Sequence, residues 1–161
     1  MKKVLFASCL LAFVLGSIAQ ETTNYTAATF NDTRVVNGQS VETNEEGQLK
    51  FLISHRFGLI SEGFDNFFGL DQATIRLGLD YGVTDRFTVG IGRSSFEKTV
   101  DGFAKYKILR QSSGAKNTPV TITWQSNAAI RTADFSEIPG VDYDFANRMT
   151  YGHQVMIARK F

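Results

Sequence analysis

Residues 73–92 read ATIRLGLDYGVTDRFTVGIG, and this stretch decides the fold class. Before the turn at 83–86, apolar residues alternate with Thr, Arg, Gly and Asp; after it, Phe87, Val89 and Ile91 alternate with Thr and Gly. Successive residues of a β-strand point to opposite faces, so the two arms form a hairpin with one apolar face and one polar, glycine-rich face. Tyr81 and Phe87 flank the turn on the apolar face, where a transmembrane barrel carries its aromatic girdle. The pattern predicts a transmembrane-type β-hairpin.

The same alternation continues on both sides of the hairpin, in residues 49–57, 100–110, 120–130 and 149–161. Segments of about 9–11 residues suit tilted strands that cross a bilayer, whereas strands of soluble proteins cluster near about 5–6. We therefore predict an all-β fold, an antiparallel up-and-down transmembrane β-barrel. Closed membrane barrels need at least about eight strands. Six are found, so the chain is truncated, completes its barrel by oligomerising, or is not a membrane barrel. We expect a barrel that is incomplete in this chain.

The chain divides into three parts. Residues 1–19 have the form of a secretory signal peptide, with Lys2 and Lys3 before an apolar stretch and Ser17-Ile18-Ala19 as the cleavage pattern, which places cleavage after Ala19. Residues 20–46 are an N-terminal extension with a short hairpin, for which Asn37-Gly38 is the expected turn. Residues 47–161 are the β-barrel domain, expected to be truncated at its C-terminal end.

The amino-acid composition of the chain excludes several classes of function. The single cysteine, Cys9, lies in the signal peptide, so the mature chain has no disulfide, thiol nucleophile or cysteine metal site. The 17 Lys and Arg and 16 Asp and Glu are dispersed, which gives no basis for nucleic-acid binding. No later stretch reaches about 18 consecutive apolar residues, as a transmembrane helix requires. Membrane embedding must therefore be by strands, and we expect the bacterial outer membrane as the location.

Charged residues follow the polar parity of the predicted strands. Arg or Lys on the lipid face costs about 2–4 kcal/mol near the midplane, so these charges are expected to face the lumen. Such a lumen is either an anion-favouring pore or a narrow interior filled by ion pairs such as Arg76 with Asp80. The candidate lumen-facing charges are Lys50, Arg56, Arg76, Asp80, Asp101, Lys105, Lys107 and Lys160, and the candidate lipid-interface aromatics are Tyr81, Phe87, Tyr106 and Trp124.

Other features give weaker indications. Phe64, Phe67 and Phe68 make the 58–71 connection apolar, as a loop resting on the rim or as a docking patch. His55 and His153 share the apolar parity and give no metal-ligand spacing, so no metal or cofactor is expected. A lipid-acting enzyme using His55 or His153 with Ser126 lacks a third group to orient the histidine. Placing the 83–86 turn in the periplasm puts the long connections 58–71 and 131–147 outside.

Several segments together resemble an uncharacterised bacterial outer-membrane β-barrel family, a domain of unknown function. The resemblance rests on Ser40-Val41-Glu42, on FLISHRFG at 51–58, GFDNFFGLD at 63–71, LDYGVTDRFTVGIGRSS at 79–95 and FAKYKILRQ at 103–111. It implies that this chain corresponds to the N-terminal part of a longer barrel, and it supplies no catalytic residue and no substrate. The C-terminal Phe161, with apolar residues at alternate positions before it, resembles the signal that barrel-assembly machinery recognises.

The sequence therefore predicts an outer-membrane β-barrel that is not an enzyme and is pore-forming, transport-associated or structural. Its expected partners are outer-membrane lipid and the barrel-assembly machinery. The main alternative is a soluble periplasmic or secreted β-sandwich that binds an apolar ligand, with a lipid-acting barrel enzyme as a third hypothesis.

Overall fold

A computed structural model describes residues 22–36, 38–133 and 144–161 of the chain. Its main element is a six-stranded antiparallel sheet in the order β10-β9-β7-β6-β5-β4. The strands are β4 (Leu49–Arg56), β5 (Thr74–Thr84), β6 (Phe87–Ser94), β7 (Val100–Leu109), β9 (Thr121–Ile130) and β10 (Met149–Ala158). Each strand pairs with its neighbour along the chain, apart from the short β8 (Ser112–Gly114) that lies between β7 and β9.

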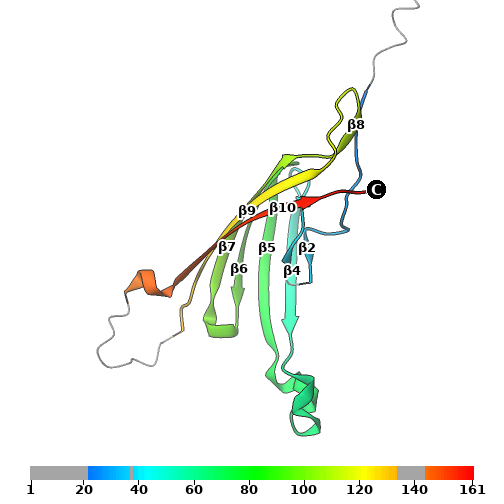
Figure 1. Cartoon of the computed structure of the whole chain (residues 1–161). Helices are drawn as coiled ribbons and strands as arrows, with labels where there is room; N and C mark the ends of the chain where they lie inside the picture. The colour runs from blue at the N-terminus through cyan, green and yellow to red at the C-terminus, as the bar shows by residue number, and fades with distance from the viewer. Residues whose placement is uncertain (1–21, 37, 134–143) are drawn as a thin grey trace, which may run out of the picture.

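The sheet is strongly curved and open, with β4 and β10 as its edges (Figure 1). The predicted antiparallel β-barrel, incomplete in this chain, is confirmed. The predicted strand at 149–161 ends earlier than expected, at Ala158. The proposed signal peptide, residues 1–19, lies outside the described residues. None of the helices in the described part of the chain is long and apolar enough to cross a membrane.

The connections that follow β4, β6 and β9 lie at one end of the sheet, and those that follow β5 and β7 lie at the other (Figure 1). At one end are the 3₁₀ segments η1 (Ile60–Glu62), η2 (Phe64–Gln72), η3 (Phe96–Lys98) and η4 (Phe145–Arg148). At the other are the β5–β6 turn and β8, which pairs with β1 (Thr23–Tyr25). We refer to these as the connection end and the turn end. Part of the 131–147 connection lies outside the described residues.

The N-terminal hairpin forms, but its turn is shifted by one residue from the prediction. β2 (Arg34–Val35) pairs with β3 (Gly38–Gln39), and Val35 stands opposite Gly38. The two-residue loop is therefore Val36-Asn37 rather than Asn37-Gly38, and Asn37 itself lies outside the described residues. Val36 has a φ of 52°, which is unusual for a β-branched residue. Pairing on both sides fixes the loop here despite that cost, so local turn preference did not decide the register.

Burial is inverted relative to a soluble protein. On β5 the odd-numbered residues Ile75, Leu77, Leu79 and Tyr81 are exposed, while Gly78, Asp80 and Gly82 are buried. Among the described residues only Val41 and Phe103 are buried large apolar side chains. The exposed apolar convex face is the one that suits lipid, and the concave face is the polar interior.

Leu79 lies halfway along β5 on the convex face, so we expect Leu79→Arg to lower the free energy of unfolding by about 2–4 kcal/mol, the cost of a guanidinium near the bilayer midplane. The measurement is denaturant unfolding of the protein in lipid vesicles. Gln154→Arg on the concave face of β10 adds the same side chain without placing it in lipid, and should cost much less. Equal costs for the two variants would mean that the convex face does not face lipid.

Candidate functional site

The concave face of the sheet is covered by the chain's own N-terminal segment. Residues 26–36 and 38–48, called the plug below, follow β1, and their polar groups meet the polar wall of the sheet. Phe103 is a buried aromatic residue of the wall beneath it, and the other large buried side chains there are polar: Asp80, Thr88, Lys105, Thr123 and Gln125. A buried polar group without a partner is costly. The plug supplies partners to several of them.

Lys105, like Asp80, is a fully buried charged residue, with 0% of its surface exposed. Its ammonium donates to the carbonyl oxygens of Thr33 at 2.9 Å, Ser40 at 3.3 Å and Glu42 at 3.1 Å. An ammonium has three donors, so main-chain oxygens of the plug satisfy all of them. This contact joins β7 to both ends of the plug hairpin.

Asp80 on β5 holds the plug from the opposite wall. The Arg34 guanidinium donates to both carboxylate oxygens of Asp80, at 3.3 and 3.2 Å. The Asn44 side-chain amide donates to the Asp80 carbonyl at 3.1 Å, and the Asn44 backbone N–H donates to Thr88 Oγ1 at 2.9 Å. On β9, the Thr123 hydroxyl donates to the Val41 carbonyl at 2.7 Å. The plug thus contacts four strands of the wall.

Two carboxylates of the plug also bind lysine side chains of the wall. Glu42 pairs with Lys107 at 3.1 Å and also accepts the N–H of Thr29 at 2.8 Å. Burial alone would raise the pKa of Glu42, but Lys107 and the N–H donors more than offset it, and the pKa lies below its usual value. Asp32 accepts from Lys50 at 2.6 Å, and this hydrogen bond lowers the pKa of Asp32 despite partial burial. Both groups are therefore held as anions at neutral pH.

Glycine on the wall lets the plug approach closely. Gly82 exchanges backbone hydrogen bonds with the plug end, receiving from Gly47 N–H at 2.8 Å and donating to Gln48 at 2.9 Å. A Cβ at Gly82 would lie 1.9 Å from the Glu45 carbonyl oxygen. No side chain fits at this position while the plug is seated, which accounts for part of the glycine-rich polar face seen in the sequence.

The predicted ion pair between Arg76 and Asp80 is wrong. Arg76 instead binds Asp101 on β7, donating from Nε at 2.8 Å and from Nη2 to the second carboxylate oxygen. Asp80 is bound by Arg34 of the plug. Arg76 reaches across β6 because Gly92 leaves room: a Cβ there would lie 2.2 Å from Arg76 Nη2. The interior is therefore ordered by pairs across strands and with the plug, not along one strand.

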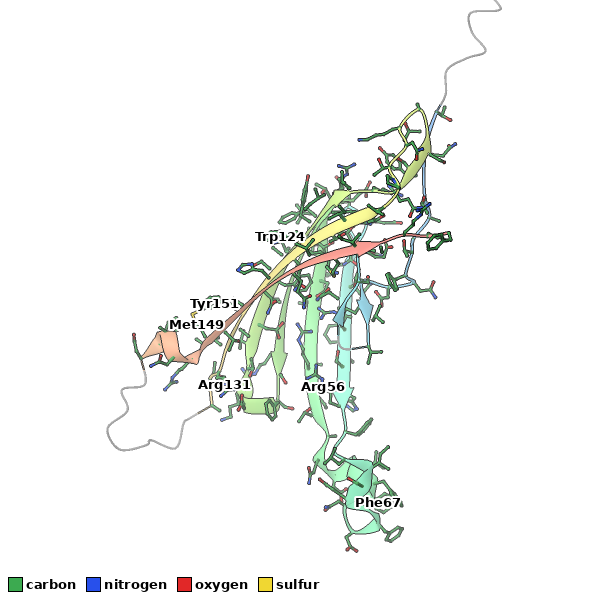
Figure 2. All side chains as sticks on the ribbon, viewed as in Figure 1. Arg56, Phe67, Trp124, Arg131, Met149 and Tyr151 are labelled. Atoms are coloured by element: carbon green, nitrogen blue, oxygen red, sulfur yellow. The ribbon has the colours of Figure 1, made fainter. Side chains whose placement is uncertain are left out.

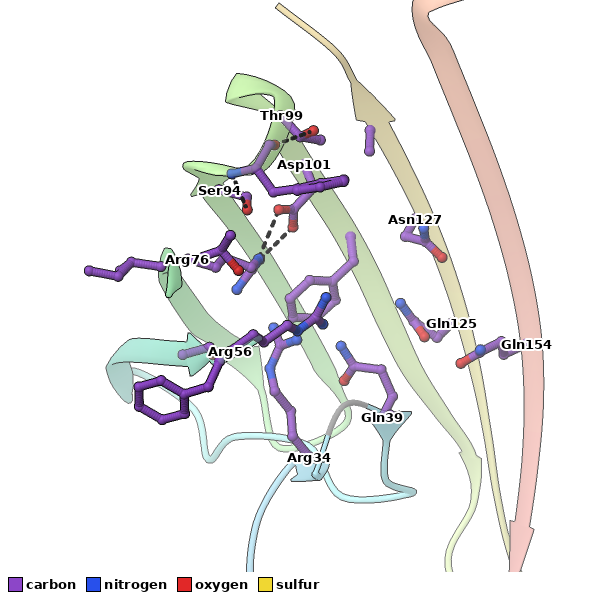
Figure 3. Close-up of a pocket in the computed structure, with 18 of the residues that line it drawn as sticks. Arg34, Gln39, Arg56, Arg76, Ser94, Thr99, Asp101, Gln125, Asn127 and Gln154 are labelled. Atoms are coloured by element: carbon purple, nitrogen blue, oxygen red, sulfur yellow. Dashed lines mark hydrogen bonds and ion pairs between the residues drawn. The ribbon is translucent and has the colours of Figure 1, made fainter. Parts of the chain in front are cut away.

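Cavities lie on both sides of the plug. A cavity of about 630 Å³ at the connection end is lined by Arg34, Arg56, Arg76, Asp101 and several amide side chains (Figure 3). A second of about 350 Å³ at the turn end is lined by plug residues with Asp85, Lys107 and Arg110. We call the first the arginine cavity. The plug separates the two.

The predicted lumen-facing charges therefore fall into three groups. Lys50, Asp80, Lys105 and Lys107 contact the plug, while Arg76, Asp101 and Arg56 line the arginine cavity. Lys160 lies beyond β10 and is exposed; its ammonium donates to the Ala28 carbonyl at 3.2 Å.

The four predicted interface aromatics lie together on the convex face. Phe87, Tyr106 and Trp124 are successive register partners across β6, β7 and β9, with the Phe87 and Tyr106 rings 6.4 Å apart. Tyr81 is exposed on the same face of β5. They form a row of the kind that a lipid interface holds.

The apolar loop patch lies at the connection end, away from the sheet, as the position of Phe67 shows (Figure 2). Phe64 contacts Phe67 and Phe68 with ring centroids 5.7 and 6.3 Å apart, and all three side chains remain exposed. The patch is thus a small aromatic cluster outside the strands.

The two histidines do not form a site. His153 stands opposite Ser126 in the register, but it stacks on Trp124 at 6.3 Å. The neighbouring residues on that face include Ala104, Ala128, Val155 and Tyr151, and the Tyr151 hydroxyl donates to the Met149 sulfur rather than to the histidine. A catalytic base needs a group that orients it. His55 packs edge-on against Phe57. Within the described ranges, no three His, Cys, Asp or Glu residues come together as a metal site.

The sequence did not indicate the plug. Much of its binding comes from main-chain carbonyls, which any residue carries, so the partners of Lys105 have no sequence signature. The available signal was the wall itself: a buried lysine, a buried aspartate and glycines on one face require something to fill and neutralise that face.

Gly82→Ala should unseat the plug, because the added methyl group overlaps the Glu45 carbonyl while the strand itself accepts alanine. We expect faster trypsin cleavage after Arg34, with an unchanged heat-dependent shift on gels. Gly102→Ala is the matched control, since its Cβ would have ordinary contacts, the nearest at 3.6 Å. Equal cleavage rates in the two variants would show that the plug does not lie against Gly82.

Because two carboxylates help to hold the plug, we expect the plug to be released from the wall in acid. Because their folded pKa values are depressed, Glu42 and Asp32 stabilise the seated plug above their ordinary pKa values, and this contribution is lost as pH falls through the lower folded values. A fluorophore at Val36→Cys should gain mobility only below about pH 4. Adding Glu42→Gln and Asp32→Asn should increase mobility already at neutral pH and flatten the dependence; an unchanged acid transition would contradict this assignment.

The chain was compared with known proteins. No curated protein and no solved structure matches it. A family model described as a membrane bound beta barrel domain (DUF5777) matches residues 30–161. The match begins within the plug, so most of the plug is part of the family's domain together with the strands. The fold, the inverted burial and this match agree, and the chain belongs to the membrane-bound β-barrel domain family of unknown function.

Proposed function

We propose that this protein is a non-enzymatic, transport-associated barrel of the bacterial outer membrane whose lumen is closed at rest by its own N-terminal segment. The observation that carries the proposal is the seating of the plug against Lys105, Asp80, Thr88 and Thr123. An open pore needs a continuous water path, and here the plug stands between the arginine cavity and the cavity at the turn end.

The chemistry of the contacts supports a plug that moves. Of its side chains, only Val41 is a buried large apolar group, and the Arg34 guanidinium lies 5.2 Å from the ring centroid of Phe103; the other contacts with the wall described above are hydrogen bonds and ion pairs. In a wet lumen, each such bond exchanges for a bond to water at a net cost of about 0.5–1.5 kcal/mol. The strands, by contrast, cannot lose their backbone pairing within lipid. The plug can therefore leave while the barrel stays folded.

The remaining functions are less favoured. A lipid-acting enzyme would need a third group that orients His153 beside Ser126, and the nearby Tyr151 hydroxyl hydrogen-bonds Met149 instead. A soluble β-sandwich would cover its apolar face with a second sheet, whereas the convex face here is uncovered in the described residues. A purely structural barrel has no use for a plug with a cavity on each side.

Outer-membrane lipid and the barrel-assembly machinery are the partners this proposal requires. The turn end, where the plug enters beside β1 and β8, is then the periplasmic end, and the Phe64–Phe67–Phe68 cluster faces outward from the cell. The β4–β5 connection and the β5–β6 turn fit the rule that short turns are periplasmic and long connections external, whereas the connection 95–99 is shorter than 110–120 and does not fit it.

Removing the plug tests the function directly. In planar bilayers we expect little conductance from the native protein and several-fold more after deletion of residues 22–46. A disulfide between Asn44→Cys and Thr88→Cys should hold the plug and keep conductance low, since these residues already share a hydrogen bond and the mature chain has no other cysteine.

The heat-dependent gel shift of each form shows whether its barrel is folded. A folded deletion variant with the conductance of the native protein would overturn the proposed closure, as would steady native conductance that the disulfide leaves unchanged.

A further inference from the structure

We infer that the arginine cavity is a binding site for an oxyanion, the carboxylate or phosphate group of a small water-soluble solute. Three guanidinium groups, from Arg34, Arg56 and Arg76, line this one cavity. They come from three different elements: the plug hairpin, β4 and β5. Of the residues that hold the plug, Arg34 also lines the cavity, and the space of the cavity itself has no role in seating the plug.

The charges around the cavity do not balance. Arg34 is paired with Asp80 and Arg76 with Asp101. Arg56 has neither an ion pair nor a hydrogen bond with any residue that the structure describes, and it reaches into the cavity near Arg34 (Figure 3). Arg56 is exposed, so water screens part of its repulsion with Arg34, and an anion between the two would turn that repulsion into attraction. One positive charge in the cavity is therefore unneutralised.

The carboxylate that lines the cavity is already paired. Asp80 is fully buried behind Arg34, so Asp101 is the carboxylate that lines the cavity in the described part of the chain, and Arg76 binds it. Guanidinium groups bind carboxylate and phosphate in paired geometry. The Arg56 guanidinium has no such acceptor among the described residues, and an oxyanion is the chemical group that would supply one.

The size and position of the arginine cavity indicate which kind of ligand it can bind. A volume of about 630 Å³ falls within the range of small-molecule sites. The cavity lies on the concave face, opposite the face that meets lipid, so a dissolved solute rather than a lipid headgroup is the ligand. Amide side chains of Gln39, Gln125, Asn127 and Gln154 line the same cavity and can bind the neutral part of such a solute.

The site keeps Arg34 only while the plug is seated, but it does not require the plug to move. Anion binding in the cavity can therefore be tested separately from movement of the plug. Binding to the Asn44→Cys/Thr88→Cys form with its disulfide closed measures the site alone, whatever conductance shows.

The test is titration calorimetry of the folded protein in uncharged detergent, at fixed ionic strength, with inorganic phosphate and with malonate as probes. We expect at least one probe to bind, and Arg56→Gln to weaken binding about tenfold or more, the effect of losing a charge-assisted hydrogen bond. Arg56→Lys should retain part of the affinity. Arg93→Gln, which removes an exposed charge from the outer face of β6, should leave affinity unchanged.

Two results would overturn the site. If neither anion binds the native protein, Arg56 is neutralised by other means, for example by an acidic residue on a strand that closes the barrel. If Arg93→Gln weakens binding as much as Arg56→Gln, the effect is overall charge and not this cavity. Adding phosphatidylglycerol separates the sources: displacement of the bound probe would identify a lipid headgroup as the ligand and contradict a dissolved solute.

Discussion

The buried ammonium of Lys105 is the interaction on which the rest of this structure depends. A charge with no access to water must find fixed partners, or its burial costs several kcal/mol. Here all three acceptors are main-chain oxygens of the plug. A strand that places apolar residues toward lipid must place polar residues inward, since its side chains alternate. The polar groups on the concave wall therefore need hydrogen-bond partners, and the plug supplies them. The wall and the plug stabilise each other in this way.

The strands were predictable because one physical rule dominates them. Lipid on one side and polar groups on the other force a period of two over eight or more residues, and nothing in the connections competes with it. The boundaries found agree to within one residue for β7 and β9, although the register of β7 shifts between Lys107 and Leu109. They agree less for β10, where the chain leaves the sheet after Ala158 while the alternation continues. Periodicity shows which residues share a face, but not where pairing stops.

The interior was harder to predict because its partners lie far apart in sequence. Arg76 and Asp80 share one face of β5, yet four residues along a strand span about 13 Å, too far for a direct pair in extended backbone. Asp101 lies two strands away but closer in space, since Gly92 between them has no side chain. Charge type and face could be read from the sequence; the pairing needed the register. The plug needed more, because carbonyl groups leave no pattern.

Arg34 links the two parts of the lumen, since it belongs to the plug and also lines the arginine cavity. An anion that binds through Arg34 binds best when the plug is seated, and by linkage it then stabilises the seated plug by the same free energy. A solute in the cavity would therefore hold the barrel closed, not open it. Opening must instead act on contacts the solute does not share, at Lys105 or at the Glu42–Lys107 pair. Those contacts lie on the side of the plug away from the cavity, where Glu42 and Lys107 line the space at the turn end. A signal that releases the plug is thus expected from that end of the barrel, while the solute enters from the other.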